Sequence, residues 1–328
     1  MDIKVKDILN VCNGKLIIGN KETICENFSK DTRLIQKDDV YVGIKGENFD
    51  GNTLYVQALE NGAKVCIISG IDVPEEVKHK FEDRSIILVD DTINALGQIA
   101  SYKRSLYNIP VIAITGSVGK TSTKDIVASV VGTSFDVLKT EGNMNNHIGL
   151  PMTILKLKNH NALVVEMGMN NLGEISTLSK IAKPNIAIIT NVGTAHIGNL
   201  GSRENILKAK LEILEGLQKN GTLIINNDND LLNEWLKKYS DHANVSTYGI
   251  DNKSDIMASN IDLGETTSKF RLYVNEKQST YAKNGEQINV PVGGKHFVYN
   301  ALCAISVGKI LGIKIDNVKK RNRAIWTK

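Results

Sequence analysis

The 328-residue sequence predicts an α/β protein: a small amino-terminal α/β domain followed by a central domain whose mostly parallel sheet is covered by helices. The first observation is a repeated order of strand, glycine turn and helix, with strands at 111–115, 162–166, 186–190 and 222–226. The second is that these strands are apolar throughout, which is typical of a parallel sheet buried on both faces. The third is composition, because 41% hydrophobic and 23% charged residues suffice for a large core.

The first 108 residues contain shorter elements. We predict strands here at 40–45, 65–69 and 86–90. We predict helices at 55–63 and 92–107. Beyond the fourth long strand, residues 245–291 are expected to be antiparallel, followed by a helix from about His296 to Leu311. We therefore place the domains at 1–108 and 109–312, with 313–328 as a residual tail.

Bulk properties exclude several classes of protein. The 40 basic residues are spread among 36 acidic ones and no basic block stands out, so nucleic acid is not an expected partner. The polar start MDIKVKDILN lacks the apolar core of a signal peptide, and the apolar runs are strand-sized, so we expect a cytoplasmic protein without a membrane span. The four cysteines show no pairing or metal-ligand spacing and are expected to be reduced, buried or half-buried thiols.

A glycine-rich turn joins the first long strand to its helix and has the parts of a phosphate-binding loop. It reads Gly116, Ser117, Val118, Gly119, Lys120, Thr121 and Ser122. Glycines let backbone amides approach phosphate oxygens, the helix start adds positive potential, the lysine neutralises charge and the threonine can hold Mg²⁺. The commonest nucleotide-binding loop would have glycine at Ile114, so the spacing indicates a sub-family. The alternative is a glycine turn without a ligand.

Two further strand ends carry chemical groups. The strand at 162–166 ends in Glu166, and the strand at 186–190 leads to His196. Ligands gather at the carboxyl ends of parallel strands, so these residues and Thr121 are candidate Mg²⁺ ligands. Either residue alone could instead be an ordinary polar end of a strand.

Lys210 is unexpected in its helix. After Ser202, a plausible N-cap, the apolar stripe is Leu207, Leu211 and Leu214, and Lys210 falls on it at helical spacing. An inward lysine should have a lowered pKa or a chemical purpose. The alternative is a lysine at the edge of the stripe, with its ammonium group in water.

Six segments together resemble the central domain of the Mur ligases, in order along nearly the whole chain. They are TGSVGKTSTKD (115–125), GNMNNHIGLPMTIL (142–155), VVEMGMNNLGEI (164–175), TNVGTAHIGNLGS (190–202), KAKLEI (208–213) and GGKHFVYNALCA (293–304). The segment at 29–51 also resembles the UDP-sugar-binding domain of this family. Within the family, the blocks at 121–125 and 143–151 are most similar to members that add D-alanyl-D-alanine (D-Ala-D-Ala) to UDP-N-acetylmuramoyl-tripeptide. Members that form the tripeptide or add D-glutamate are the alternatives.

The resemblance implies a role for each matching residue. Lys120 and the loop amides would hold the β- and γ-phosphates of ATP, and Thr121, Glu166 and His196 would serve Mg²⁺. Lys210 matches the lysine that is carbamylated in this family, which would turn an inward cation into an anion supporting a second Mg²⁺. The remaining matches are the adenine-side residues His296 and Asn300, the muramoyl-peptide-side residues Asn145 and Asn146, and the candidates for uridine and diphosphate, Ser29, Asp31, Thr32, Arg33 and Lys45. The last group could also be an ordinary surface loop.

The implied reaction has two steps: the peptide carboxylate attacks the γ-phosphate to give an acyl phosphate, and the amine of D-Ala-D-Ala then displaces phosphate. We expect a monomer with Lys120, Lys210 and His196 in catalytic roles. Family members continue into a third domain that grips the incoming amine, but only 28 residues follow Asn300, and a domain needs at least about 50. We therefore expect that domain to be absent and ligation by this chain to be slow. A remnant that binds without ligating, and another phosphate-loop enzyme such as a kinase or GTPase, are the competing hypotheses.

Overall fold

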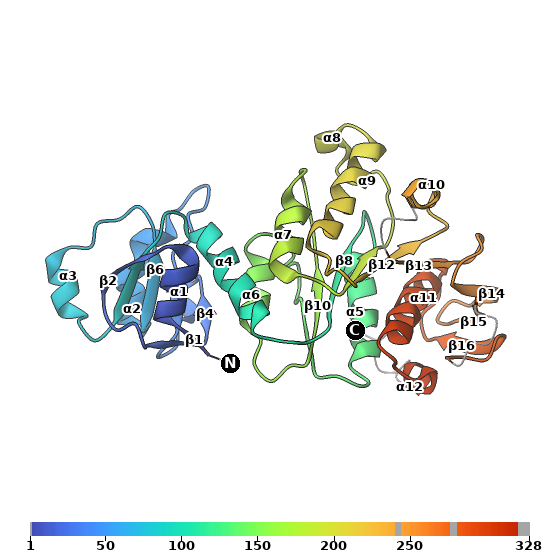
Figure 1. Cartoon of the computed structure of the whole chain (residues 1–328), viewed down its shortest axis with the longest axis horizontal. Coiled ribbons are helices and arrows are strands. Elements are labelled where there is room, and N and C mark those ends of the chain that lie inside the picture. The colour runs from blue at the N-terminus through green and yellow to red at the C-terminus, as the bar shows by residue number, and fades with distance from the viewer. Residues whose placement is uncertain (1, 240–243, 276–280, 321–328) are drawn as a thin grey trace. The chain divides into compact units, whose positions relative to one another are not determined.

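The computed structural model describes residues 2–239, 244–275 and 281–320, and the chain forms two compact units (Figure 1). The first unit comprises Met1–Asn108 and His147–Lys158, and the second comprises Ile109–Asn146 and Asn159–Lys328. The α/β class with a mostly parallel, helix-covered sheet is confirmed. The closing residues 321–328, on which part of the predicted tail falls, lie outside the described residues.

A five-stranded sheet in the order β2-β7-β6-β5-β4 forms the centre of the first unit. Its strands are β2 (Lys15–Ile18), β4 (Phe28–Ser29), β5 (Val40–Val42), β6 (Val65–Ile68) and β7 (Ser85–Leu88), and only β2 runs antiparallel to its neighbour. The other elements are β1 (Ile3–Lys4), β3 (Ile24–Cys25), α1 (Val5–Cys12), α2 (Tyr55–Glu60), α3 (Glu75–Lys80), α4 (Thr92–Ser105) and the short 3₁₀ helices Thr32–Leu34 and Gly51–Leu54.

Residues 147–158 belong to the first unit, although the sequence places them in the central domain. This segment contains α6 (Gly149–Leu155), whose residues are all buried and which packs against α4. The Tyr107 hydroxyl also donates a hydrogen bond to the Leu157 carbonyl at 2.9 Å. An apolar helix must bury its surface, and the partner it finds here is remote in sequence.

The second unit contains a nine-stranded sheet in the order β16-β15-β14-β13-β12-β11-β8-β10-β9. Its strands are β8 (Val111–Thr115), β9 (Val137–Lys139), β10 (Ala162–Glu166), β11 (Ile186–Ile189), β12 (Thr222–Asn226), β13 (Asn244–Gly249), β14 (Ile256–Leu263), β15 (Ser268–Val274) and β16 (Glu286–Val290). Its helices are α5 (Lys120–Val131), α7 (Glu174–Ala182), α8 (Ile197–Leu200), α9 (Arg203–Leu211), the 3₁₀ helix Glu212–Gly216, α10 (Asp230–Tyr239), α11 (Lys295–Ile310) and α12 (Ile315–Lys320).

The antiparallel prediction for residues 245–291 is only partly right. Strand β13 runs parallel to β12, and β14 runs parallel to β13 through two residue pairs. Antiparallel pairing is confined to β14 with β15 and β15 with β16. Helix α10 lies between β12 and β13 in the chain, and it supplies the long crossover that a parallel pair requires.

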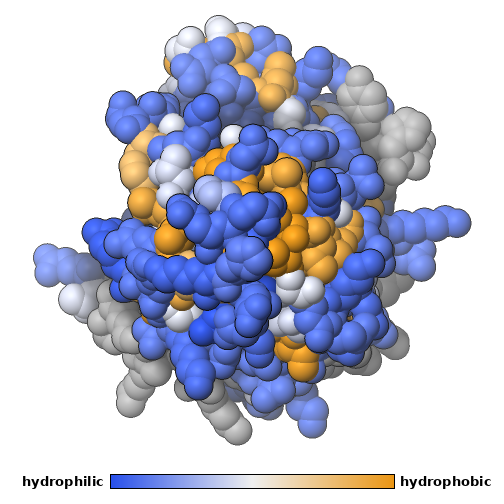
Figure 2. Space-filling model, turned by 90° about the vertical axis from the view of Figure 1, so that its left-hand side faces the viewer, coloured by the Kyte–Doolittle hydropathy of each residue, from blue (hydrophilic) through white to orange (hydrophobic). Residues whose placement is uncertain are grey.

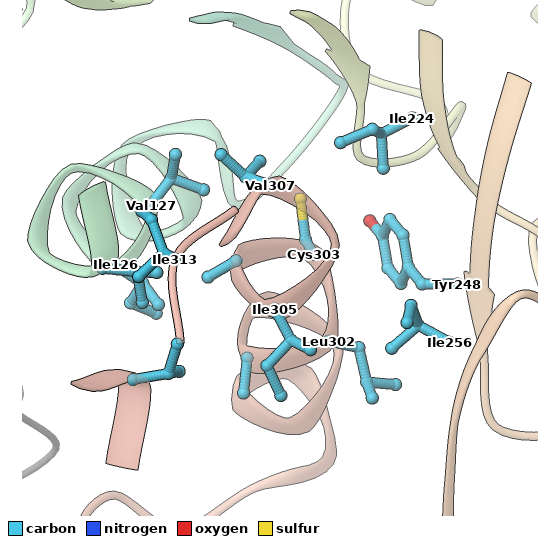
Figure 3. Close-up of a cluster of buried hydrophobic side chains, with 14 of the residues drawn as sticks. Ile126, Val127, Ile224, Tyr248, Ile256, Leu302, Cys303, Ile305, Val307 and Ile313 are labelled. Atoms are coloured by element: carbon cyan, nitrogen blue, oxygen red, sulfur yellow. The ribbon is translucent and has the colours of Figure 1, made fainter. Parts of the chain in front are cut away.

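The core of the second unit is built around α11 (Figure 3). Ile126 and Val127 of α5 lie on one side of this helix, and Ile224, Tyr248 and Ile256 of the sheet lie on the other. Because α11 packs against both α5 and the strands, it is placed against the helix that follows the loop 116–119.

The surface view in Figure 2 is largely hydrophilic, with apolar side chains in patches among polar ones. Throughout the described ranges, no helix has the length and apolar character needed to cross a membrane. All four cysteines are free thiols, three of them buried, as the sequence predicts.

Candidate functional site

The loop 116–119 leads from β8 into α5, and Lys120 is the first residue of that helix. A side chain at Gly116 would overlap the Thr190 hydroxyl, and Gly119 has φ +78°, so glycine is required at both positions. The first backbone amides of α5 have no acceptor within the helix, and they form the positive end of its dipole. The predicted strand, glycine loop and helix are therefore present in the arrangement that binds phosphate.

Asn191, which the sequence analysis did not single out, closes this loop from the end of β11. Its Oδ1 atom accepts hydrogen bonds from the amides of Ser117 at 3.2 Å and Val118 at 3.1 Å, and its Nδ2 donates to the Val118 carbonyl at 2.9 Å. The Lys120 ammonium donates to the Gly116 carbonyl at 2.9 Å. The loop therefore satisfies several of its own polar groups.

A buried carboxylate lies beside the start of α5. Glu166, at the end of β10, is 2% exposed, and its two oxygens accept hydrogen bonds from the Thr121 hydroxyl and the Asn145 side-chain amide, both at 2.8 Å. Burial lowers the pKa of Lys120, and the nearby Glu166 opposes that shift. Three separate segments thus bring together side chains with oxygen atoms that could bind a metal ion: Thr121, Asn145 and Glu166. This cluster lies next to Lys120.

Lys210 is 1% exposed, so the inward orientation that the sequence predicts is confirmed and the stripe-edge alternative is wrong. The buried face of α9 and the turn after it consists of Ile206, Ala209, Lys210 and Ile213, whereas the three leucines of the predicted stripe are only half-buried. Among the described residues, the Lys210 ammonium has no hydrogen-bond or ion-pair partner. Burial, together with the charge of Lys120, lowers its pKa to about 7.

Ser202 caps α9, because its side chain accepts a hydrogen bond from the Asn205 amide. His196 precedes α8, where it is exposed and has φ +67°. Within the described ranges no hydrogen bond or ion pair joins His196 to Glu166 or Thr121. Its role toward Mg²⁺ therefore stays a prediction.

Asn300 lies in the second turn of α11 and is 9% exposed. Its Oδ1 accepts a hydrogen bond from the Thr123 hydroxyl of α5 at 2.9 Å. His296 is exposed in the first turn of the same helix, and its ring centroid lies 4.2 Å from that of Phe297, with the two rings tilted by 42°. The candidate base-side residues thus share one helix, which contacts the helix of the phosphate loop.

The candidates of the first unit form a small polar loop. Ser29 and Asp31 are joined by hydrogen bonds, and Asp31 forms an ion pair with Arg33 at 2.6 Å that holds the pKa of the carboxyl at about 2. Thr32 is 5% exposed and donates to Gln57, so it stabilises the loop from inside. Lys45 is exposed and its backbone forms a bridge with Asp50. Asn146, in the second unit, is the residue after Asn145, which donates to Glu166.

The model of the Mur ligase middle domain matches residues 114–308, well over half of the chain. The chain belongs to the Mur ligase family. The matched range contains the phosphate loop, Glu166, His196, Lys210 and Asn300.

Two relatives of this Mur ligase chain carry the same name. The UDP-N-acetylmuramoyl-tripeptide--D-alanyl-D-alanine ligase of Bacillus subtilis is 38% identical over 96% of this chain and 65% of its own length, and that of Escherichia coli is 30% identical over 97% and 67%. A crystal structure of MurF from Acinetobacter baumannii, 30% identical, superposes with TM-score 0.87 over 100% of this chain and 69% of its own. MurF ligase from Thermotoga maritima in complex with ADP, 28% identical, gives 0.77 over 90% and 65%. The chain thus spans about two thirds of the length of these relatives.

Sequence reasoning found the groups with recognisable chemistry and missed those that support them. Asn191 and Thr123 act through hydrogen bonds to residues 73 and 177 positions away, and no local pattern reports such pairs. Among described residues, no group of three or more His, Cys, Asp or Glu side chains gathers as a metal site would. Two of the four candidate Mg²⁺ ligands, the Thr121 hydroxyl and a carbamate on Lys210, are not side chains of these four types.

Proposed function

We propose that this chain is the ATP-using part of an amide ligase, which joins D-Ala-D-Ala to UDP-N-acetylmuramoyl-tripeptide through an acyl phosphate. The observation that carries the proposal is Lys210, a buried lysine without a partner in the described structure, whose pKa the charge of Lys120 helps to lower. A buried lysine without an anionic partner is costly, and the charge of a second lysine nearby adds to that cost. An anion that reaches both side chains would offset it. The triphosphate of ATP supplies that anion.

The donor set fits Mg²⁺. The Glu166 carboxylate and the Thr121 hydroxyl are hard oxygen ligands, already joined at 2.8 Å at the mouth of the phosphate loop. When bound, the ion would neutralise charge on the β- and γ-phosphates. Asn145 donates to the second Glu166 oxygen and would hold the carboxylate in one orientation.

Lys210 would contribute as a carbamate. A pKa of about 7 leaves a large share of the side chain as neutral amine near neutral pH, and the neutral amine is the form that attacks CO₂. The new N–C bond forms, one proton is released, and an unfavourable buried cation becomes an anion. That anion would lie near Lys120 and offer oxygen ligands to a second Mg²⁺, as in the family resemblance.

The chemistry follows in two balanced steps. A carboxylate oxygen of the tripeptide attacks the γ-phosphorus, the bond to the β-phosphate oxygen breaks, and ADP leaves. The amine nitrogen of D-Ala-D-Ala then attacks the acyl carbon, phosphate leaves with the bonding electrons, and the amine loses a proton. Lys120 and the amides at the start of α5 would hold the phosphate oxygens as the phosphoryl group moves.

The substrate assignment follows relatives such as the Bacillus subtilis and Escherichia coli enzymes, which are both named for this ligation. Ser29, Asp31, Thr32, Arg33 and Lys45 are proposed for uridine and diphosphate, and Asn145 and Asn146 for the muramoyl-peptide side. The family match does not favour the kinase and GTPase alternatives.

Isothermal titration with MgATP tests the proposal. Lys120→Ala should weaken binding about 100-fold, because it removes a charge-assisted contact to phosphate from a half-buried lysine. Lys180→Ala is the matched control, since this exposed lysine of α7 pairs with Ser176 and Glu215 on the surface. Equal MgATP affinity of wild type and Lys120→Ala would refute the phosphate-loop assignment.

A further inference from the structure

The backbone ladder between β9 and β10 stops just before Glu166. The last registered pair joins Lys139 to Val164, and the Thr140 amide still donates to the Val164 carbonyl at 3.0 Å. In a continued parallel ladder the Thr140 carbonyl would accept the next hydrogen bond, from the Glu166 amide. That amide donates instead to the Thr140 hydroxyl at 3.0 Å. A side chain therefore takes over from the ladder at the residue that ends β10.

The Thr140 carbonyl is bound by a lysine of α5. Lys124 is 2% exposed, and its ammonium group donates to this carbonyl at 2.9 Å. The Asp125 carboxylate lies 3.4 Å from the same ammonium group and pairs with Lys139 at 2.5 Å. A buried ammonium group is costly, and these two partners offset that cost. The contact ties the residue after β9 to the helix that follows the phosphate loop.

The chain then turns back to the same carboxylate. The Asn145 side chain donates to a Glu166 carboxylate oxygen at 2.8 Å, and the Asn145 carbonyl accepts from the Gly168 amide at 2.9 Å. Thr121 donates to the other carboxylate oxygen. Glu166 is thus held at its backbone amide by Thr140 and at its carboxylate by two further side chains.

We propose that Thr140 and Lys124 are positioning residues that set the Mg²⁺ affinity of the nucleotide site. They do so by fixing Glu166 relative to Thr121. The inference rests on the proposed binding of MgATP. Thr121 and Lys124 lie one turn apart on α5, so a single helix presents the hydroxyl ligand and anchors the segment that holds the carboxylate ligand.

Magnesium is sensitive to this geometry. The ion requires near-ideal octahedral coordination at short distances, so displaced ligand oxygens bind it less well. Groups that orient metal ligands typically contribute about 10- to 100-fold to metal affinity. The contacts proposed for phosphate, from Lys120 and the loop amides, do not involve Thr140 or Lys124. Loss of either positioning residue should therefore weaken ATP binding only when Mg²⁺ is present.

The test compares ATP binding to the whole chain in saturating Mg²⁺ and in EDTA, by titration calorimetry. The ratio of the two affinities measures the contribution of the metal. Thr140→Val removes the hydroxyl with little change of shape, Thr140→Ser keeps it, and Lys124→Met removes the ammonium group. One matched control is Thr153→Val, because the buried Thr153 hydroxyl donates within α6. The other is Lys139→Met, because Lys139 pairs with the same Asp125 but is exposed.

Thr140→Val and Lys124→Met should each lower the affinity ratio about tenfold, and should leave the ATP affinity in EDTA within about twofold of wild type. Thr140→Ser and both controls should match wild type. Thermal unfolding checks that each variant folds, and Thr140→Val decides the question if Lys124→Met does not fold.

A role in stability alone would lower the unfolding temperature and leave the affinity ratio unchanged. If wild type binds ATP more tightly with Mg²⁺ and either folded variant keeps the wild-type ratio, the inference is overturned while the proposed function stands. If wild type binds no ATP, or binds it no better with Mg²⁺ than in EDTA, the proposed function fails and this inference with it.

Discussion

Replacing Lys210 by methionine should stabilise the metal-free chain while abolishing its use of ATP. The side chain is 1% exposed and has no partner in the described structure, so its ammonium form is desolvated without compensation. Methionine has a similar length and no charge, so it suits the buried face that Lys210 shares with Ile206, Ala209 and Ile213.

The size of the effect follows from the pKa. Burial lowers the pKa of Lys210 from 10.5 to about 7. Each pH unit between the two values corresponds to about 1.4 kcal/mol, so the charged form costs the folded state at most about 4 kcal/mol at pH 7 and about 2 kcal/mol at pH 9. Between these pKa values the unfolded chain binds more protons, so the penalty is full below pH 7 and disappears as pH approaches 10.5.

Denaturant unfolding at pH 7 and pH 9, in metal-free buffer depleted of CO₂, measures this difference. Lys210→Met should gain stability at both pH values, with the larger gain at pH 7. The control is Lys208→Met on the exposed face of the same helix, for which we expect a change within about 0.5 kcal/mol at either pH. A Lys210→Met variant that is no more stable than wild type at pH 7, or whose gain does not shrink at pH 9, would refute the reasoning. Added bicarbonate should not restore ATP use to this variant.

Three further predictions concern other sites. Partial burial opposes ionisation of Asp228, but hydrogen bonds from the amides of residues 250–252 and from Tyr299 outweigh that effect and lower its pKa. Asp228→Asn should therefore lower the free energy of unfolding by about 1–2 kcal/mol at pH 7. Calorimetry should show this difference between variant and wild type fading as the pH falls below 3.8. Gly116→Ala should weaken MgATP binding at least tenfold in a filter-binding assay, because its methyl group displaces Thr190 and reshapes the loop, an effect of about 1.4 kcal/mol or more. Burial raises the pKa of the Cys12 and Cys25 thiols to about 12, so a thiol reagent at pH 8 should label neither rapidly until denaturant is added, and fast labelling of the native chain would contradict their burial.

The sequence predicted the long strands well because each is a fully apolar run bounded by polar or glycine residues. The strands β8, β10 and β12 have the predicted bounds, and β11 ends one residue early. Strand β9 was missed, since it has three residues, partly exposed at the edge of the sheet, and carries little apolar signal. The pairing of β13 with β14 was also missed, because strand direction depends on partners that periodicity does not report.

The residues of the candidate site could likewise be predicted only where a local sequence pattern marks them. Lys120, Glu166 and Lys210 could be found because a lysine at a helix start, a carboxylate at a strand end and a lysine at helical spacing to apolar residues are local patterns. Asn191 and Thr123 could not, because a polar residue at a loop or in a helix gives no sign of a partner far along the chain.

The unsatisfied groups distinguish the binding site from the scaffold. Buried polar residues that only stabilise the fold are bonded within it, as Thr153 is to Gly149 and Tyr107 is to Leu157. Lys210 and the Asn300 amide nitrogen lack such partners in the described ranges, and both occur in the unit that contains the phosphate loop. Each of these two groups destabilises the chain when no ligand is bound. Both are hydrogen-bond donors that a nucleotide could satisfy, and Lys210 as a carbamate would instead offer oxygen ligands to magnesium. Ligand binding should therefore raise the free energy of unfolding by the amount that the affinity and concentration of the ligand set, and Lys210→Met should reduce that rise.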